Sequence, residues 1–349
     1  MSQQQRNSSF ELLRIISMFL IVAHHYSVHS GFNFLEPLSV NLYYAQCLAS
    51  GGKFGVNIFV LISGYFLCKS TFKWQKLIKL ELQVLFYSII IGVVFYIYSE
   101  EKSLSNLVFS FLPLYSSEYW FYKAYFVLFL LSPFLNVFIN SIEKTQYQKL
   151  LVILFILWVL IPILPKIDAL EMSELSWFIY LYLCAAYIRF YQNDFIKSSS
   201  MYIILALGTY LLILLSTFAF DILALYNSFF QKYYSYFYPM NSILVFLASI
   251  FSFIGFSKIN IKSNKIINTF SSATFGIYLI HDNSYIRYYL WNSLFKNKEF
   301  FLKDSLYIHS FLVIFIVYLG CTLLDLIRQY LFEKPFFKTI DKIKSHKYF

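Results

Sequence analysis

Long apolar stretches, separated by short polar or basic segments, run through almost the whole chain. About ten of these stretches are near the length that a helix needs to cross a bilayer. Their predicted limits are residues 10–30, 50–68, 77–98, 122–140, 149–165, 175–191, 201–220, 239–257, 267–290 and 306–332. The pattern predicts an all-α protein, a polytopic transmembrane bundle of about ten helices. Because the linkers are short, residues 1–349 are predicted to form a single integral membrane domain.

The composition supports this class and changes how the charge is interpreted. Hydrophobic residues make up 59% of the chain and charged residues only 13%, whereas soluble domains carry about 25%. The formal net charge of +10 comes from Lys and Arg in short loops, so it indicates membrane topology rather than nucleic-acid binding. Most of these residues share one side if the N-terminus is cytoplasmic, which predicts that both termini are cytoplasmic.

The ends of the chain and the cysteines add two further expectations. The segment before residue 10 is polar and lacks an Ala-x-Ala cleavage signal, so we expect the first apolar stretch to be retained. The four cysteines are scattered, without a CxxC pair or a histidine at metal-ligand spacing. Neither a disulfide framework nor a metal site is therefore expected.

Arg14 and His25, two side chains that are costly inside a bilayer, lie within the first apolar stretch. On a helix their spacing corresponds to three turns within about 20° and a rise of about 16 Å, so both lie on one face. A neutral imidazole can accept a proton from a hydroxyl or carry an acyl group, and a guanidinium can bind phosphate. The pair therefore suits a long anionic ligand held at Arg14 and reacting at His25, whereas His24 should point about 100° away.

Each of these residues also has a structural interpretation. His25 or His24 can stabilise packing through a hydrogen bond to a neighbouring helix. Arg14 can pair with Glu11 or extend to the interface.

A basic segment follows the second apolar stretch. Ser63 and Gly64 interrupt that stretch near its end, and four lysines come next: Lys69, Lys73, Lys76 and Lys79. The segment is either an ordinary cytoplasmic loop or a cradle for the phosphates of a nucleotide-like cofactor, and the spacing does not decide between them. Glu81 is expected to offset this charge or to orient Arg14.

Candidate acceptor-binding residues lie at the predicted outer ends of two other stretches. Glu118, Trp120 and Tyr122 begin one of them, either as part of an interfacial aromatic belt or as a platform for sugar rings. Tyr278 and His281 are neighbours on one face of another, with Asp282 placed to orient a histidine. Ser132-Pro133 is expected to kink its helix and leave room for a cavity.

Four segments, in order, resemble the acyltransferase-3 family of integral membrane acyltransferases. They read LLRIISMFLIVAHH, GVNIFVLISGYFL, WFYKAYFVLFLLSPFLN and TFGIYLIH, and the resemblance covers roughly residues 10–330. It implies ten core helices, acyl transfer, usually of acetyl from acetyl-CoA, and His25 as the catalytic histidine with Arg14 as its required partner. It also implies acceptors on extracytoplasmic carbohydrates, such as capsule or exopolysaccharide, and a bacterial cytoplasmic membrane as the location.

Some members of that family carry an additional extracellular SGNH hydrolase-like domain, and none is expected in this sequence. Either the membrane core transfers the group directly to the acceptor, or a partner transferase completes the reaction. A homo-oligomer is a further alternative for the assembly. The acceptor itself stays open, because other relatives modify antibiotics or small glycolipids. Membrane lipid surrounds the bundle, and nucleic acid is not an expected partner.

Two other functions compete with catalysis. A transporter or flippase should show two related halves and charged pairs deep in several spans. The sequence has no half-repeat, and few acidic residues lie deep in the spans apart from Glu81 and Asp325, which can pair with Arg328. A non-catalytic scaffold for glycan assembly is the second alternative, and neither competitor should bind or hydrolyse acetyl-CoA.

Overall fold

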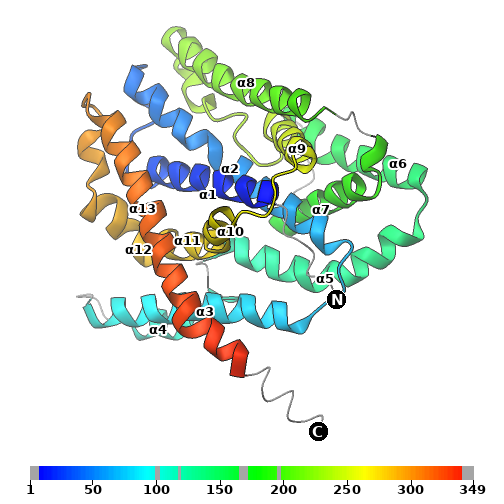
Figure 1. Cartoon of the computed structure of the whole chain (residues 1–349). Helices are drawn as coiled ribbons and strands as arrows, with labels where there is room; N and C mark the ends of the chain where they lie inside the picture. Colours follow the sequence, from blue (N-terminus) through cyan, green and yellow to red (C-terminus); the bar gives the residue numbers. More distant parts are fainter. Residues whose placement is uncertain (1–7, 99–102, 117–118, 165–171, 195–197, 340–349) are drawn as a thin grey trace.

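The computed structural model describes residues 8–98, 103–116, 119–164, 172–194 and 198–339, and within these ranges the chain is helical with no strand. Figure 1 shows the helices gathered around the first one. The α-helices are α1 (Ser8–Val28), α2 (Val40–Leu67), α3 (Trp74–Tyr98), α4 (Leu104–Ser110), α5 (Trp120–Ser141), α6 (Lys144–Phe155), α7 (Glu174–Phe190), α8 (Ser199–Tyr226), α9 (Ile243–Lys258), α10 (Lys265–Ser272), α11 (Thr274–His281), α12 (Ser284–Tyr288) and α13 (Leu306–Arg328). Short 3-10 or π segments extend or connect them: η1 (Ile156–Leu160), η2 (Ile161–Ile163), η3 (Gln192–Asp194), η4 (Ser228–Tyr233), η5 (Tyr289–Leu294), η6 (Asn297–Phe300) and η7 (Gln329–Glu333).

Helices long and apolar enough to cross a membrane account for most of the described chain. Seven meet both conditions, and a shorter apolar helix, α9, accompanies them. The seven are Ser8–Val28, Val40–Leu67, Trp74–Tyr98, Trp120–Ser141, Lys144–Ile163, Ser199–Tyr226 and Leu306–Thr339. The predicted all-α membrane bundle is confirmed, while the count of ten spans and the cytoplasmic placement of the termini stay predictions.

Two helices differ from the predicted limits in ways that affect the site. α2 begins at Val40 rather than near residue 50, because Ser39 caps it by accepting a hydrogen bond from the Leu42 N–H. The predicted stretch 267–290 is not one helix but three, α10, α11 and α12. Its Ser and Asn side chains bond to nearby backbone, as Asn283 does when it caps α12, and such bonds compete with a continuous helix.

α1 is the central helix of the bundle. It packs against α2 along much of its length and also contacts α9, α10, α11 and α13 (Figure 1). Glycines of α2 permit the close approach to α1. A methyl group on Gly55 would lie 2.7 Å from the Ser17 carbonyl oxygen, and one on Gly52 would overlap the His24 ring. The helix that carries the candidate residues is thus held in place by its nearest neighbour.

α5 continues through Pro133 as an α-helix. A proline has no N–H, so the carbonyl of Phe129, four residues earlier, loses its usual donor. The Ser132 hydroxyl donates to that carbonyl instead, at 2.7 Å. The Ser-Pro pair therefore compensates for the missing bond within the helix.

The glycine contacts predict a difference in stability between two otherwise similar substitutions. Gly55→Ala should lower the free energy of unfolding by about 1–3 kcal/mol, because the added methyl group overpacks the α1–α2 contact. Thermal unfolding of the detergent-solubilised protein measures the effect. Gly208→Ala in α8 is the matched control, since no atom lies within 4 Å of a methyl group there. Equal melting temperatures for the two variants would contradict the close contact.

Candidate active site

A chain of hydrogen bonds determines which nitrogen of His25 carries a proton. The Nδ1 of His281 lies 2.5 Å from the Ile277 carbonyl oxygen, which can only accept, so this nitrogen is the donor. In a neutral ring the Nε2 of His281 is then an acceptor, and the Nδ1 of His25, 2.8 Å away, donates to it. The Nε2 of His25 is left with a lone pair, the form that a general base or nucleophile requires.

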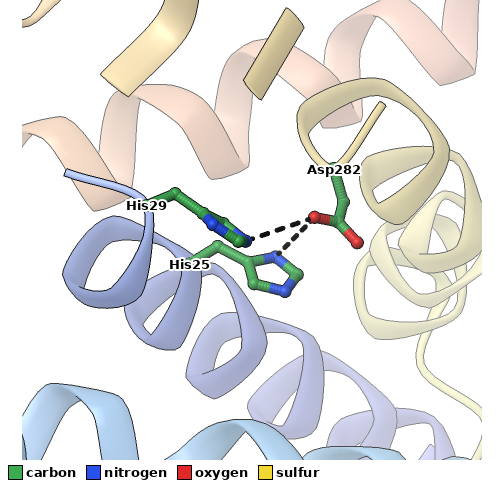
Figure 2. Close-up of side chains that lie close together, drawn as sticks. All are labelled: His25, His29 and Asp282. Carbon is green, nitrogen blue, oxygen red and sulfur yellow. Dashed lines mark ion pairs between the residues drawn. The ribbon is translucent and has the colours of Figure 1, made fainter. Parts of the chain in front are cut away.

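An acidic side chain lies beside this pair. The Oδ1 of Asp282 is 3.7 Å from the Nδ1 of His25 and 3.7 Å from the Nε2 of His29, as Figure 2 shows. Arg287 binds the same carboxylate, with 2.9 Å between Nη2 and Oδ1. Burial, followed by the nearby Arg287 charge, lowers the pKa of His29, which follows the last residue of α1, to about 3.

Among the described residues, His25, His29 and Asp282 form the group whose side chains lie close enough together to hold a metal ion. The ligand atoms of His25, His29 and Asp282 lie within 4.8 Å of one another. However, the Nδ1 of His25 already donates to His281, and Asp282 is paired with Arg287. A metal would have to break both interactions, so the arrangement fits a hydrogen-bonded network better than a metal centre.

His25 faces a cavity that we call the histidine pocket, with about 520 Å³ of empty space. The pocket is lined by Met18, Ile21, His24, His25, Gly52, Lys53, Val56, Phe59, Trp120, Phe121, Phe275, Tyr278 and Asp282. Its wall is therefore mostly apolar and aromatic, with a few polar groups close to His25.

His24 lines this pocket as well, although the helix periodicity predicted that it would face elsewhere. Its Nδ1 lies 2.5 Å from the carbonyl oxygen of Ala49 and donates to it. Its ring packs against Gly52. Because α2 passes so close to α1, a side chain about 100° around the helix still reaches the same cavity.

A second cavity, which we call the basic pocket, lies toward the N-terminal end of α1. It has about 1180 Å³ of empty space, part of it open to the surroundings. It is lined by Glu11, Arg14, Phe59, Ser63, Phe66, Leu67, Lys76, Lys79, Leu80, Gln83, Phe121, Tyr125, Phe129, Ser271, Ser272, Thr274 and Phe275. Three of the predicted cofactor-binding residues, Arg14, Ser63 and Lys76, thus share one cavity.

The two pockets adjoin. Phe59, Phe121 and Phe275 line both of them. Arg14 opens onto one pocket and His25 onto the other, about 16 Å apart along α1. The basic cavity and the cavity lined by His25 therefore have three aromatic residues of their walls in common.

Arg14 is paired and also accessible to the basic pocket. Its Nη1 donates to both carboxylate oxygens of Glu11, at 2.9 and 2.8 Å. Glu11 also accepts a hydrogen bond from Ser271. The arginine thus has the predicted structural partner, and the two bonds to that partner use only one of its nitrogens.

The other predicted site residues divide between positions outside the pockets and positions in the wall of the histidine pocket. Lys69 and Lys73 are exposed, and the ammonium of Lys69 lies over the Phe190 ring at 5.0 Å. Tyr122 is buried and donates to Glu81, so Glu81 does not orient Arg14. His281 is fully buried behind His25, Trp120 and Tyr278 line the histidine pocket, and Glu118 lies outside the described residues.

Lys53 is a polar residue of the histidine pocket that the sequence analysis did not select. The predicted stretch 50–68 placed Lys53 at its outer end, where a lysine near the membrane surface is unremarkable. In the structure it lies in the middle of α2, and its Nζ is 4.2 Å from the centre of the Trp120 ring. The capping residue Ser39 was the signal that would have moved Lys53 from the end to the middle of the helix.

Deep acidic groups form a separate network beside the basic pocket. Asp325 accepts hydrogen bonds from Gln83, Tyr87 and Arg328, at 3.2, 2.8 and 2.8 Å. Arg328 continues to Glu333, which pairs with Lys79 at 2.6 Å. The network joins α3 to α13, and the predicted pairing of Asp325 with Arg328 is confirmed.

Comparison with known proteins gives one match. A family model described as an acyltransferase domain matches residues 7–325, which is most of the chain and includes both pockets. No curated protein and no solved structure matches the chain.

The hydrogen-bond chain predicts a specific histidine tautomer. In protein labelled with 15N-histidine, the side-chain spectrum of His25 should show a protonated Nδ1 and an unprotonated Nε2. His281→Leu removes the acceptor, so the variant should show a mixture of the two neutral tautomers. Thr269→Val, on the exposed face of α10, is the control and should leave the spectrum unchanged. A His25 ring protonated at Nε2 in the unaltered protein would contradict the assignment.

Proposed function

The chain belongs to the acyltransferase-3 family of integral membrane acyltransferases, and from this premise we propose that it moves an acetyl group from cytoplasmic acetyl-CoA to a hydroxyl of an extracytoplasmic glycan. The observation that carries the proposal is the pair of adjoining pockets, one basic and one holding the unprotonated nitrogen of His25. The location that fits is the cytoplasmic membrane of a bacterium, which the chain crosses several times.

The basic pocket suits the donor. Lys76 and the Arg14 nitrogens that do not bond to Glu11 offer positive charge to the phosphates of the nucleotide, whereas Lys79 is paired with Glu333. Charge-assisted bonds to phosphate are the strong ones. The rise from Arg14 to His25, about 16 Å, is comparable to an extended pantetheine arm. The arm passes Phe59, Phe121 and Phe275, so that the thioester reaches the histidine pocket.

The histidine pocket suits the acceptor and the reaction. Trp120, Phe121 and Tyr278 provide flat apolar faces on which a sugar ring can pack, and Asp282 adds polar contacts. The Nε2 of His25 takes the proton of the acceptor hydroxyl. His281 holds the ring in the tautomer that leaves this nitrogen free, and it is thus a positioning residue rather than a group that contacts substrate.

Removing the base should stop the chemistry without removing the donor. In His25→Ala, hydrolysis and transfer of acetyl from acetyl-CoA should fall by about 10²–10⁴-fold, the usual contribution of a general base. Binding of CoA, measured by calorimetry in detergent, should stay at the value of the unaltered protein, because the basic pocket is intact. Mild-base release of ester-linked acetate from surface glycans of cells measures the complete reaction. Normal acetate in cells that carry His25→Ala would remove His25 from the mechanism.

Substitution of two lysines near the N-terminal end of α3, Lys73 and Lys76, tests the proposed donor site. Lys76 lines the basic pocket and Lys73 does not. Lys76→Gln should raise the dissociation constant for CoA by about tenfold, since a hydrogen bond to a charged group contributes about 1.5–3 kcal/mol. Lys73→Gln removes the same charge from the same segment and should leave the constant unchanged. Equal effects of the two substitutions would indicate general attraction to a basic surface rather than this pocket.

A further inference from the structure

Lys53 occupies an unusual position for a lysine. It lies in the middle of the 28-residue helix α2, half-buried, and lines the histidine pocket together with His25. A charged side chain at such a depth is costly in a membrane protein and commonly serves a ligand or a pathway. Its Nζ lies over the face of Trp120, and both residues line the pocket.

Among the residues that the structure describes, no carboxylate lies within ion-pair distance of this ammonium, although Glu174 and Asp282 are near enough to attract it. None of the ion pairs there includes Lys53. Asp282, the acidic residue of the pocket, is paired with Arg287 at 2.9 Å. The contact with Trp120 is a cation–π interaction, which orients the ammonium but adds no negative charge. The ammonium of Lys53 is thus available to form an ion pair with a negative group of the substrate.

We propose that Lys53 binds the negatively charged oxygen that develops on the thioester carbonyl during acyl transfer. The inference rests on the proposed function and assigns a catalytic role to a residue outside the Arg14–His25 pair. Preorganised positive groups directed at such an oxygen commonly make the largest electrostatic contribution to catalysis, and a pocket with little water strengthens it.

The step balances as follows. The acceptor oxygen attacks the carbonyl carbon, a C–O bond forms, and the carbonyl π electrons move to the oxygen, which Lys53 stabilises. The Nε2 of His25 takes the acceptor proton. When the intermediate collapses, the C–S bond breaks, and the leaving thiolate takes that proton from His25 to give CoA. The products are the ester and the free thiol, and Lys53 stays protonated throughout.

The other side chains of the pocket are less suited to this role. His24 uses its Nδ1 proton on the Ala49 carbonyl, which leaves an acceptor at Nε2. Asp282 is negative and would repel the oxygen. Tyr278 is a neutral donor, and charge-assisted hydrogen bonds are roughly twice as strong as neutral ones. Lys53 is thus the lining residue whose charge matches the intermediate.

Purified full-length protein with acetyl-CoA alone, and water as the acceptor, tests the assignment. In Lys53→Met the kcat for thioester hydrolysis should fall by about 10²-fold, the usual loss for one such donor. The KM for acetyl-CoA and the dissociation constant for CoA should not change, because the interaction forms only in the transition state. Lys53→Arg keeps the charge and should retain part of the activity. Lys123→Met is the matched control, a half-buried lysine of α5 whose ammonium bonds to the Ser116 carbonyl outside the pocket.

Three other results would overturn the proposal. A higher KM with unchanged kcat would make Lys53 a donor-binding residue. Unchanged hydrolysis together with lost acetate on cell-surface glycans would make it a binding group for an acidic acceptor. No change in either assay would leave it without a role in the reaction. If Lys53→Met does not fold, Lys53→Gln decides by the same comparison of kcat with KM. An unaltered protein that neither binds nor hydrolyses acetyl-CoA would instead refute the proposed function itself.

Discussion

The hydrogen bond between His25 and His281 is the interaction on which the site depends. It joins residues 256 positions apart in the chain and connects the central helix α1 to α11. Inside a bundle that spans lipid, a polar group without a partner is expensive, so this bond stabilises the fold. The same bond places the proton on one nitrogen of His25 and frees the other. A single hydrogen bond thus pairs two polar groups inside the bundle and leaves the Nε2 of His25 unprotonated.

The sequence predicted the features that follow from helix periodicity and from length. Arg14 and His25 were placed on one face by their spacing, and each lines one of two adjoining pockets. The apolar stretches predicted an all-helical membrane protein, which the structure confirms. These inferences succeeded because a helix of known pitch determines the direction of its own side chains, whatever packs around it.

Features that depend on contacts between helices could not be predicted in this way. The approach of Gly52 to His24 and the burial of Tyr122 against Glu81 both arise from packing. Lys53 was missed for a related reason, since a capping serine extends its helix by ten residues beyond the apolar pattern. Of the four lysines that look equivalent along the sequence, Lys76 and Lys79 line the basic pocket and Lys69 and Lys73 do not.

The three phenylalanines that separate the two pockets have a consequence for the cell. Their rings make the junction apolar, so a hydrated ion would have to give up its water to pass. A slender uncharged chain carries no such penalty. In the proposed reaction, the acyl group would therefore cross a junction that hydrated ions do not pass easily. Under that proposal, acyl transfer through the bundle would leave the membrane potential intact.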